Sequence, residues 1–170
     1  MAAQKKPTLI GVDTNVLYNR ADEDEDTIDA LATIRARLPG AEFVIPMTAA
    51  HEIANEIRSR GAAEKLARIV ALEAVSVWGF RTSALAGVKN GIAEYIGHDL
   101  RNAGLLPMEE KNDALIAAES AVEGFDILLT NDAHLLDMHW QEAQKLVREY
   151  GYRLPVISRP RKIVQSFFKK

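Results

Sequence analysis

Short apolar runs of β-forming residues alternate along this chain with longer segments whose apolar residues recur every three or four positions. Strands are predicted at residues 8–12, 43–45, 127–130 and 154–158, with a further short strand at 75–78, and helices at 27–38, 48–60, 62–72, 87–103, 108–121 and 133–150. Thr48 is the expected N-cap of the second helix, and Gly61 its end. Because parallel strands need crossover connections, the pattern predicts an α/β fold, a three-layer α/β/α sandwich with a mainly parallel central sheet.

The length and hydrophobic content of the chain indicate one domain, and its charged residues are unevenly distributed. Its 170 residues, 48% of them hydrophobic, suffice for a single domain at 1–170 with its core at about 8–158. Charge is segregated: residues 22–26 are all acidic, and residues 153–170 include six basic and no acidic residues. The basic C-terminal tail at 159–170 either contacts nucleic-acid phosphates or is a solvated end.

Apolar runs and cysteine content bear on the cellular setting. No apolar run approaches the roughly 20 residues that cross a bilayer, and the run at 9–12 is too short for a signal peptide. The absence of cysteine excludes disulfides, thiolate zinc sites and cysteine nucleophiles. We therefore expect a cytoplasmic protein with no membrane contact.

Two acids follow predicted strands, at the edge of a parallel sheet where ligands bind. Asp13 follows the first strand, and Asp132 follows the strand at 127–130. Glu52 lies one turn into the helix at 48–60, and Asp113 begins an apolar helical segment, where it is either solvent-facing or a ligand. Asp126 begins its strand, roughly 13 Å from the strand's other end, and is excluded from the site.

Several familiar sites are absent from the sequence. Neither a phosphate-binding P-loop nor a dinucleotide fingerprint occurs. A haloacid-dehalogenase-like phosphatase would carry a second aspartate at position 15, which is Asn15, and a zinc protease would carry histidine at position 55, which is Asn55. The histidines share no ligand spacing and are interpreted as surface or packing residues; they are His51, His98, His134 and His139.

Four segments in this order resemble the PIN-domain ribonucleases, whose bacterial members include the VapC-type toxins of toxin–antitoxin pairs. They are LIGVDTN at 9–15, VIPMTAAHEI at 44–53, NDALIAA at 112–118 and ILLTND at 127–132, and the resemblance extends over nearly the whole chain. It implies a PIN-like fold in which four acids hold Mg²⁺ or Mn²⁺ and catalyse hydrolysis: Asp13, Glu52, Asp113 and Asp132.

The chemistry of these residues agrees with that resemblance. Carboxylates in one pocket repel one another strongly unless cations neutralise them, and hard oxygen ligands select magnesium or manganese. A metal-activated water can then attack a phosphodiester, and the resemblance implies 5′-phosphate and 3′-hydroxyl products. Four polar residues beside the acids either orient the metal-bound water or bond backbone groups: Thr14, Asn15, Thr130 and Asn131.

Each acid also has a structural interpretation. Asp13 and Asp132 could cap helices that begin near Val16 and at Ala133. Glu56 shares a helical face with Glu52, and only the greater distance of Glu56 from the preceding strand favours Glu52.

The resulting hypothesis is a metal-dependent endoribonuclease that acts on RNA. The resemblance implies a toxin neutralised by a small antitoxin protein, and a homodimer. Two alternatives stay open: an RNA-processing PIN nuclease without an antitoxin, and a catalytically silent RNA- or protein-binding module. Candidate contacts to RNA phosphates are Arg58, Arg60, Arg81, Arg159 and Arg161.

Overall fold

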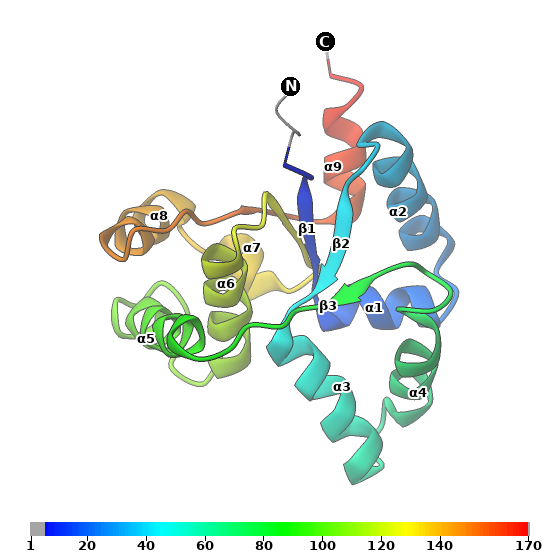
Figure 1. The fold of residues 1–170 in the computed structure, drawn as a ribbon, viewed down its shortest axis with the longest axis horizontal. Helices are drawn as coiled ribbons and strands as arrows, with labels where there is room; N and C mark the ends of the chain where they lie inside the picture. The colour runs from blue at the N-terminus through cyan, green and yellow to red at the C-terminus, as the bar shows by residue number, and fades with distance from the viewer. Residues whose placement is uncertain (1–5, 170) are drawn as a thin grey trace.

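Five parallel strands form the central sheet of the computed structural model, which describes residues 6–169 (Figure 1). In the order β3-β2-β1-β4-β5, the strands are β1 (Leu9–Val12), β2 (Glu42–Ile45), β3 (Arg81–Thr82), β4 (Ile127–Leu129) and β5 (Val156–Ser158). All four neighbouring pairs are parallel, as the alternation of strands and helices predicts. The first strand of the chain therefore lies at the centre of the sheet.

Helices cover both faces of this sheet. They are α1 (Thr14–Ala21), α2 (Glu25–Arg37), α3 (Met47–Ser59), α4 (Glu64–Glu73), α5 (Val88–Asn102), α6 (Lys111–Glu123), α7 (Ala133–Asp137), α8 (Trp140–Glu149) and α9 (Pro160–Ser166). Figure 1 shows α5 to α8 on one side and α1, α2 and α9 on the other. Separate clusters of buried apolar side chains lie under the two groups. The predicted α/β/α sandwich is confirmed. Within residues 6–169, no helix is long and apolar enough to cross a membrane.

Close packing in the middle of β1 requires a glycine. A Cβ atom on Gly11 would lie 2.5 Å from Cδ2 of Phe125, whose side chain is fully buried. Strand β1 pairs with β4 in a register that aligns their carboxyl ends. Just beyond β1, the backbone N–H of Asp13 donates to the carbonyl of Leu129 at 3.0 Å. Asp13 and Thr130 consequently lie side by side at that end of the sheet.

Residues 75–78 form turns, and the strand expected there is wrong. Val75 and Val77 are 59% and 70% exposed, whereas Trp78 is 6% exposed and donates from Nε1 to Glu73 at 3.1 Å. The edge strand is β3, where Arg81 pairs with Val44 of β2. Anchoring of the Trp78 ring in the core thus outweighs the local β-preference of the valines.

Several helix boundaries also differ from the sequence interpretation, and the helix predicted at 108–121 is observed as α6, Lys111–Glu123. The segment 133–150 is interrupted at Met138, whose backbone is extended (φ −56°, ψ 133°), and continues as α8. Pro46, not Thr48, is the N-cap of α3, because the Thr48 side chain bonds Glu119 of α6 instead. Arg60, not Gly61, takes the left-handed conformation that ends α3.

The basic C-terminal segment contains a helix that the sequence pattern did not indicate. Helix α9 packs against α2, and its Ile163 is only 8% exposed within the core. Arg161 Nη1 lies 2.9 Å from Asp26 Oδ2, so the basic and acidic segments of the chain meet in an ion pair. Residue 170 of the expected tail lies outside the described residues.

Candidate metal centre

Asp13 is a buried acid directly after β1, at the carboxyl end of the sheet. Its side chain is 2% exposed, and Oδ1 accepts a hydrogen bond from the backbone N–H of Thr14 at 2.6 Å. Oδ2 accepts from Asn15 Nδ2 and from Thr130 Oγ1, both at 2.7 Å. Burial raises the pKa of Asp13 to about 6, although these donors act in the opposite direction. Asp13 is also the N-cap of α1, so the capping interpretation is correct, and the helix begins at Thr14 instead of near Val16.

Glu52 reaches the same site from α3. The hydroxyl of Thr14 donates to Glu52 Oε2, and Asn112 Nδ2 of α6 donates to Oε1 at 2.8 Å. Because α3 starts directly after β2, a residue one turn into the helix lies close to the sheet's carboxyl edge. Thr14, the residue after Asp13, therefore holds the carboxylate of Glu52 in place.

The residues after β4 connect the Asp13 side of the site to Asp132. Thr130 is fully buried, and its hydroxyl accepts from the backbone N–H of Asp132 at 3.0 Å while it donates to Asp13. The backbone N–H of Asn131 donates to Asn15 Oδ1 at 2.8 Å. Asp132 Oδ1 accepts from the backbone N–H of Leu135 at 3.0 Å, so Asp132 caps α7.

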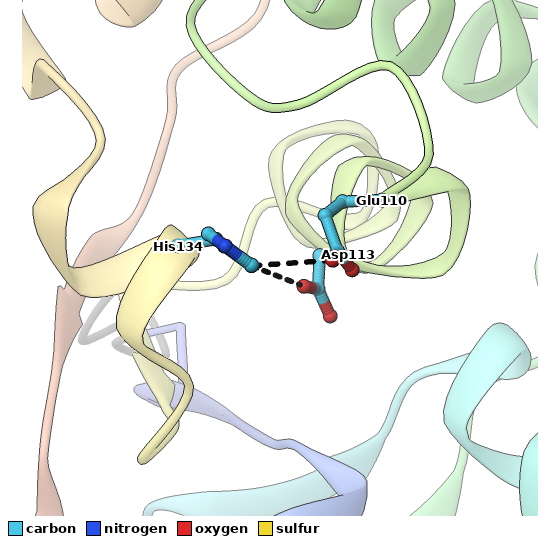
Figure 2. A group of neighbouring side chains, drawn as sticks. All are labelled: Glu110, Asp113 and His134. Atoms are coloured by element: carbon cyan, nitrogen blue, oxygen red, sulfur yellow. Dashed lines mark ion pairs between the residues drawn. The ribbon is translucent and has the colours of Figure 1, made fainter.

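Asp113, in the first turn of α6, faces Asp132 and two residues that the sequence interpretation missed. His134 Nδ1 of α7 lies 3.4 Å from Glu110 Oε1, 4.0 Å from Asp113 Oδ2 and 4.0 Å from Asp132 Oδ1. Figure 2 shows His134, Asp113 and Glu110 pointing toward one another from α7 and from the start of α6. Burial, and then the charge of Asp132, raise the pKa of Asp113 to about 8.

An open cavity of about 460 Å³ lies beside three of the four predicted acids. It is lined by Asp13, Thr14, Asn15, Tyr18, Glu52, Asn55, Glu56, Asn112 and Asp113. The electrostatic effects of Glu52 on Asp13, and of Asp13 and Asp132 on Asp113, both raise a pKa, as expected for neighbouring carboxylates without a cation.

The donor set fits a hard divalent cation. Three hydrogen bonds to Asp13 come from the described part of the chain, and they leave one of the roughly four acceptor positions of a carboxylate open. Glu110, Asp113 and His134 each offer a ligand atom within 4.8 Å of the others. Carboxylate oxygens suit magnesium and manganese, and the single imidazole is more typical of transition metals.

The four predicted acids thus gather at one end of the sheet, whereas Asp126 does not. Asp126 Oδ2 accepts from the backbone N–H of Leu9, at the opposite end of β1. Glu56 also lines the cavity, but its Oε1 accepts from the backbone N–H of Ala63 after α3. His134 lies two residues after Asp132, and that proximity was the available signal for including it in the site.

Comparison with known proteins finds solved structures with a similar fold. No protein-family model matches the sequence, and a search of curated proteins also found no match. A chain in the crystal structure of VapBC2 from Rickettsia felis, bound to a DNA fragment from their promoter, is 16% identical with a TM-score of 0.57, over 78% of this chain and 94% of that one. A chain in the structure of VapBC-1 from nontypeable Haemophilus influenzae is 14% identical with a TM-score of 0.53, over 90% of this chain and 98% of that one. The chain therefore has the PIN-like α/β/α fold, which it shares with the matched chains of these two VapBC structures.

Proposed function

We propose that this protein is a metal-dependent endoribonuclease and the toxin of a toxin–antitoxin pair. The observation that carries the proposal is the convergence of Asp13, Glu52, Asp113 and Asp132 at the carboxyl end of the sheet. Three of these acids line one cavity, and Asp132 lies beside Asp113. Such a concentration of negative charge is costly in a folded protein unless a cation is bound there.

In this proposal the four acids hold Mg²⁺ or Mn²⁺, with His134 and Glu110 at the edge of the ligand set. When bound, the ion supplies a Lewis acid that lowers the pKa of water and offsets the charge on a phosphodiester. Asn15 and Thr130 keep the Asp13 carboxylate in one orientation, and Thr14 does the same for Glu52. This chemistry needs no protein nucleophile.

Two kinds of partner are part of the proposal. Both matched structures are VapBC assemblies, which supports a small antitoxin protein as the partner of this chain; a homodimer is the further assembly we propose. RNA is the proposed substrate. Arg58 Nη2 donates to Asn55, which lines the cavity, so Arg58 is well placed to contact a phosphate of RNA bound there.

Cleavage of an unstructured, end-labelled RNA in Mn²⁺ tests the nuclease. We expect cleavage by the wild type, loss of cleavage in EDTA, and a decrease of about 100-fold or more in Glu52→Gln, because the amide cannot replace a carboxylate ligand. Glu56→Gln is the matched control, since an amide oxygen can still accept from the N–H of Ala63. Loss of activity in Glu56→Gln with retention in Glu52→Gln would contradict the site, and metal-independent cleavage would contradict the mechanism.

Metal binding is tested separately from turnover. In titration calorimetry, Mn²⁺ should bind the wild type and bind Asp13→Asn far more weakly, because Asp13 is the buried acid of the set. Equal affinity in the two proteins removes Asp13 from the site.

The antitoxin part of the proposal has its own test. If a short reading frame abuts or overlaps the gene, its product should form a stable complex with this chain and block RNA cleavage. Cleavage that is unchanged in the presence of that product favours an RNA-processing nuclease.

A further inference from the structure

Two side-chain bridges join α3 to α6 beside the candidate metal centre. Thr48, in the first turn of α3, donates from its backbone N–H to Glu119 Oε2 at 3.0 Å and from Oγ1 to Glu119 Oε1 at 2.6 Å. One turn further along α3, Glu52 accepts from Asn112 of α6. The start of α3 thus pairs with the later part of α6, and Glu52 pairs with the start of α6, which also carries Asp113.

The two bridges differ in their exposure to water. Glu119 is 1% exposed and Thr48 is 7% exposed, whereas Asn112 lies on the surface. Water competes with an exposed hydrogen bond, but breaking a buried bond to an acid leaves unsatisfied polar groups and is costly. The Glu119 bridge is therefore the one that fixes the relative position of the two helices.

Helix α3 depends on this bridge because it lacks a cap of its own. Pro46 is its N-cap residue and makes no side-chain capping bond. The first N–H groups of a helix need acceptors from elsewhere, and Glu119 supplies one from α6. Its carboxylate also lies at the positive end of the α3 dipole.

We infer that Glu119 is a positioning residue, which fixes the first turn of α3 against α6 and thereby sets the separation of Glu52 and Asp113 across the metal centre. The inference rests on the proposed function, because it concerns the same site. Glu119 is six residues from Asp113 on α6, roughly 9 Å along the axis, so it acts through the two helices and does not touch the metal. Ligand distances of about 2.0 to 2.6 Å leave little tolerance for a shift of α3.

Mn²⁺ affinity measured by titration calorimetry, well below the unfolding temperature, tests this role. Glu119→Ala should weaken Mn²⁺ binding about 10-fold, as expected when a residue that orients a ligand is lost. Glu123→Ala is the matched control: Glu123 lies one turn further along α6 and accepts from the Ser83 hydroxyl, not from α3. This control should lower the unfolding temperature and keep Mn²⁺ affinity within about twofold of wild type.

Two further variants keep the test decisive. Glu119→Gln retains an acceptor oxygen and should recover part of the lost affinity. If Glu119→Ala does not fold, Thr48→Val, which removes only the hydroxyl bond, should show a smaller loss in the same direction.

The inference is overturned if the folded Glu119 and Thr48 variants bind Mn²⁺ as tightly as wild type, or if Glu123→Ala weakens binding equally. A wild-type protein that binds no Mn²⁺ is a different result. It contradicts the proposed function itself and removes the basis of the inference.

Discussion

Asp132 combines a capping bond with a place in the acidic site, and two substitutions separate these roles. Asparagine can still accept the N–H of Leu135 but carries no charge, so Asp132→Asn should keep its stability and lose RNA cleavage. Asp132→Ala should also lose about 0.5 to 2 kcal/mol of stability with the cap. Thermal unfolding and cleavage assays on both variants measure the two effects. If Asp132→Ala melts lower but cleaves RNA normally, the residue is purely structural.

Gly11 is expected to be intolerant of even one methyl group. The Cβ of Gly11→Ala would overlap the buried ring of Phe125, and overpacking of this kind costs about 1 to 3 kcal/mol. Gly91 of α5 is the control, because a Cβ there meets nothing within 4 Å, and alanine in a helix interior stabilises by about 0.5 to 1 kcal/mol. Urea unfolding of the two variants should therefore shift in opposite directions. Equal shifts would show that the Phe125 ring moves aside at no cost.

Asp13 and Asp132 were predictable from the sequence because each follows a strand, and the topology of a parallel sheet brings those positions together. Glu52 and Asp113 lie on helices, and the resemblance to the PIN-domain ribonucleases added them to the set. Glu110 and His134 were not predictable in this way. They are 24 residues apart and meet only because α6 and α7 pack beside each other. The link between Thr48 and Glu119 was hidden for the same reason: Thr48 has the sequence signature of a helix cap, and its partner lies on another helix.

At the scale of elements, α9 is predicted to be part of the folded core. Ile163→Ala should cost about 2 kcal/mol or more, because the Ile163 side chain is buried in the cluster beneath α1, α2 and α9. The neighbouring Lys162 is exposed, so Lys162→Ala should leave the unfolding midpoint nearly unchanged. Urea denaturation provides the comparison. An unchanged midpoint in Ile163→Ala would mean that residues 159–170 behave as a solvated end, one of the two interpretations of their charge.

The elements that the sequence predicted well are those with a strong apolar period. The strands β1, β2, β4 and β5 and the helix α2 each coincide with such a run. Predictions were wrong where a single contact decides the outcome, as at residues 75–78, where the buried Trp78 ring holds the chain in turns. Helix α9 has only a short apolar pattern within a basic segment. Its formation therefore depends more on packing against α2 than on its own sequence pattern.

At the scale of the whole molecule, buried carboxyl groups should make stability depend on pH. Burial is the main cause that raises the pKa of Asp13 from 3.8 to about 6, that of Asp113 to about 8 and that of Glu123 to about 7. The unfolded chain releases these protons at lower pH. Between about pH 4 and pH 8 the folded protein therefore holds more protons than the unfolded chain, and the free energy of unfolding falls as the pH rises.

We accordingly predict that the metal-free protein unfolds at a lower urea concentration at pH 8 than at pH 5. Asp13→Asn should reduce this difference by about 1.4 kcal/mol, because above pH 5 the folded carboxyl retains its proton over only about one more pH unit, up to its pKa of about 6. Asp29→Asn, at an exposed position of α2, controls for the loss of one charge and should leave the difference unchanged.

Because metal ligands must be deprotonated, Mn²⁺ should stabilise the wild type more at pH 8 than at pH 5. The stabilisation should be about 2.7 kcal/mol when the free concentration of Mn²⁺ is 100 times Kd. Urea titrations followed by circular dichroism, in EDTA and in Mn²⁺ at both pH values, measure each quantity. The account fails if the metal-free protein is more stable at pH 8, or if Asp29→Asn changes the pH dependence as much as Asp13→Asn does.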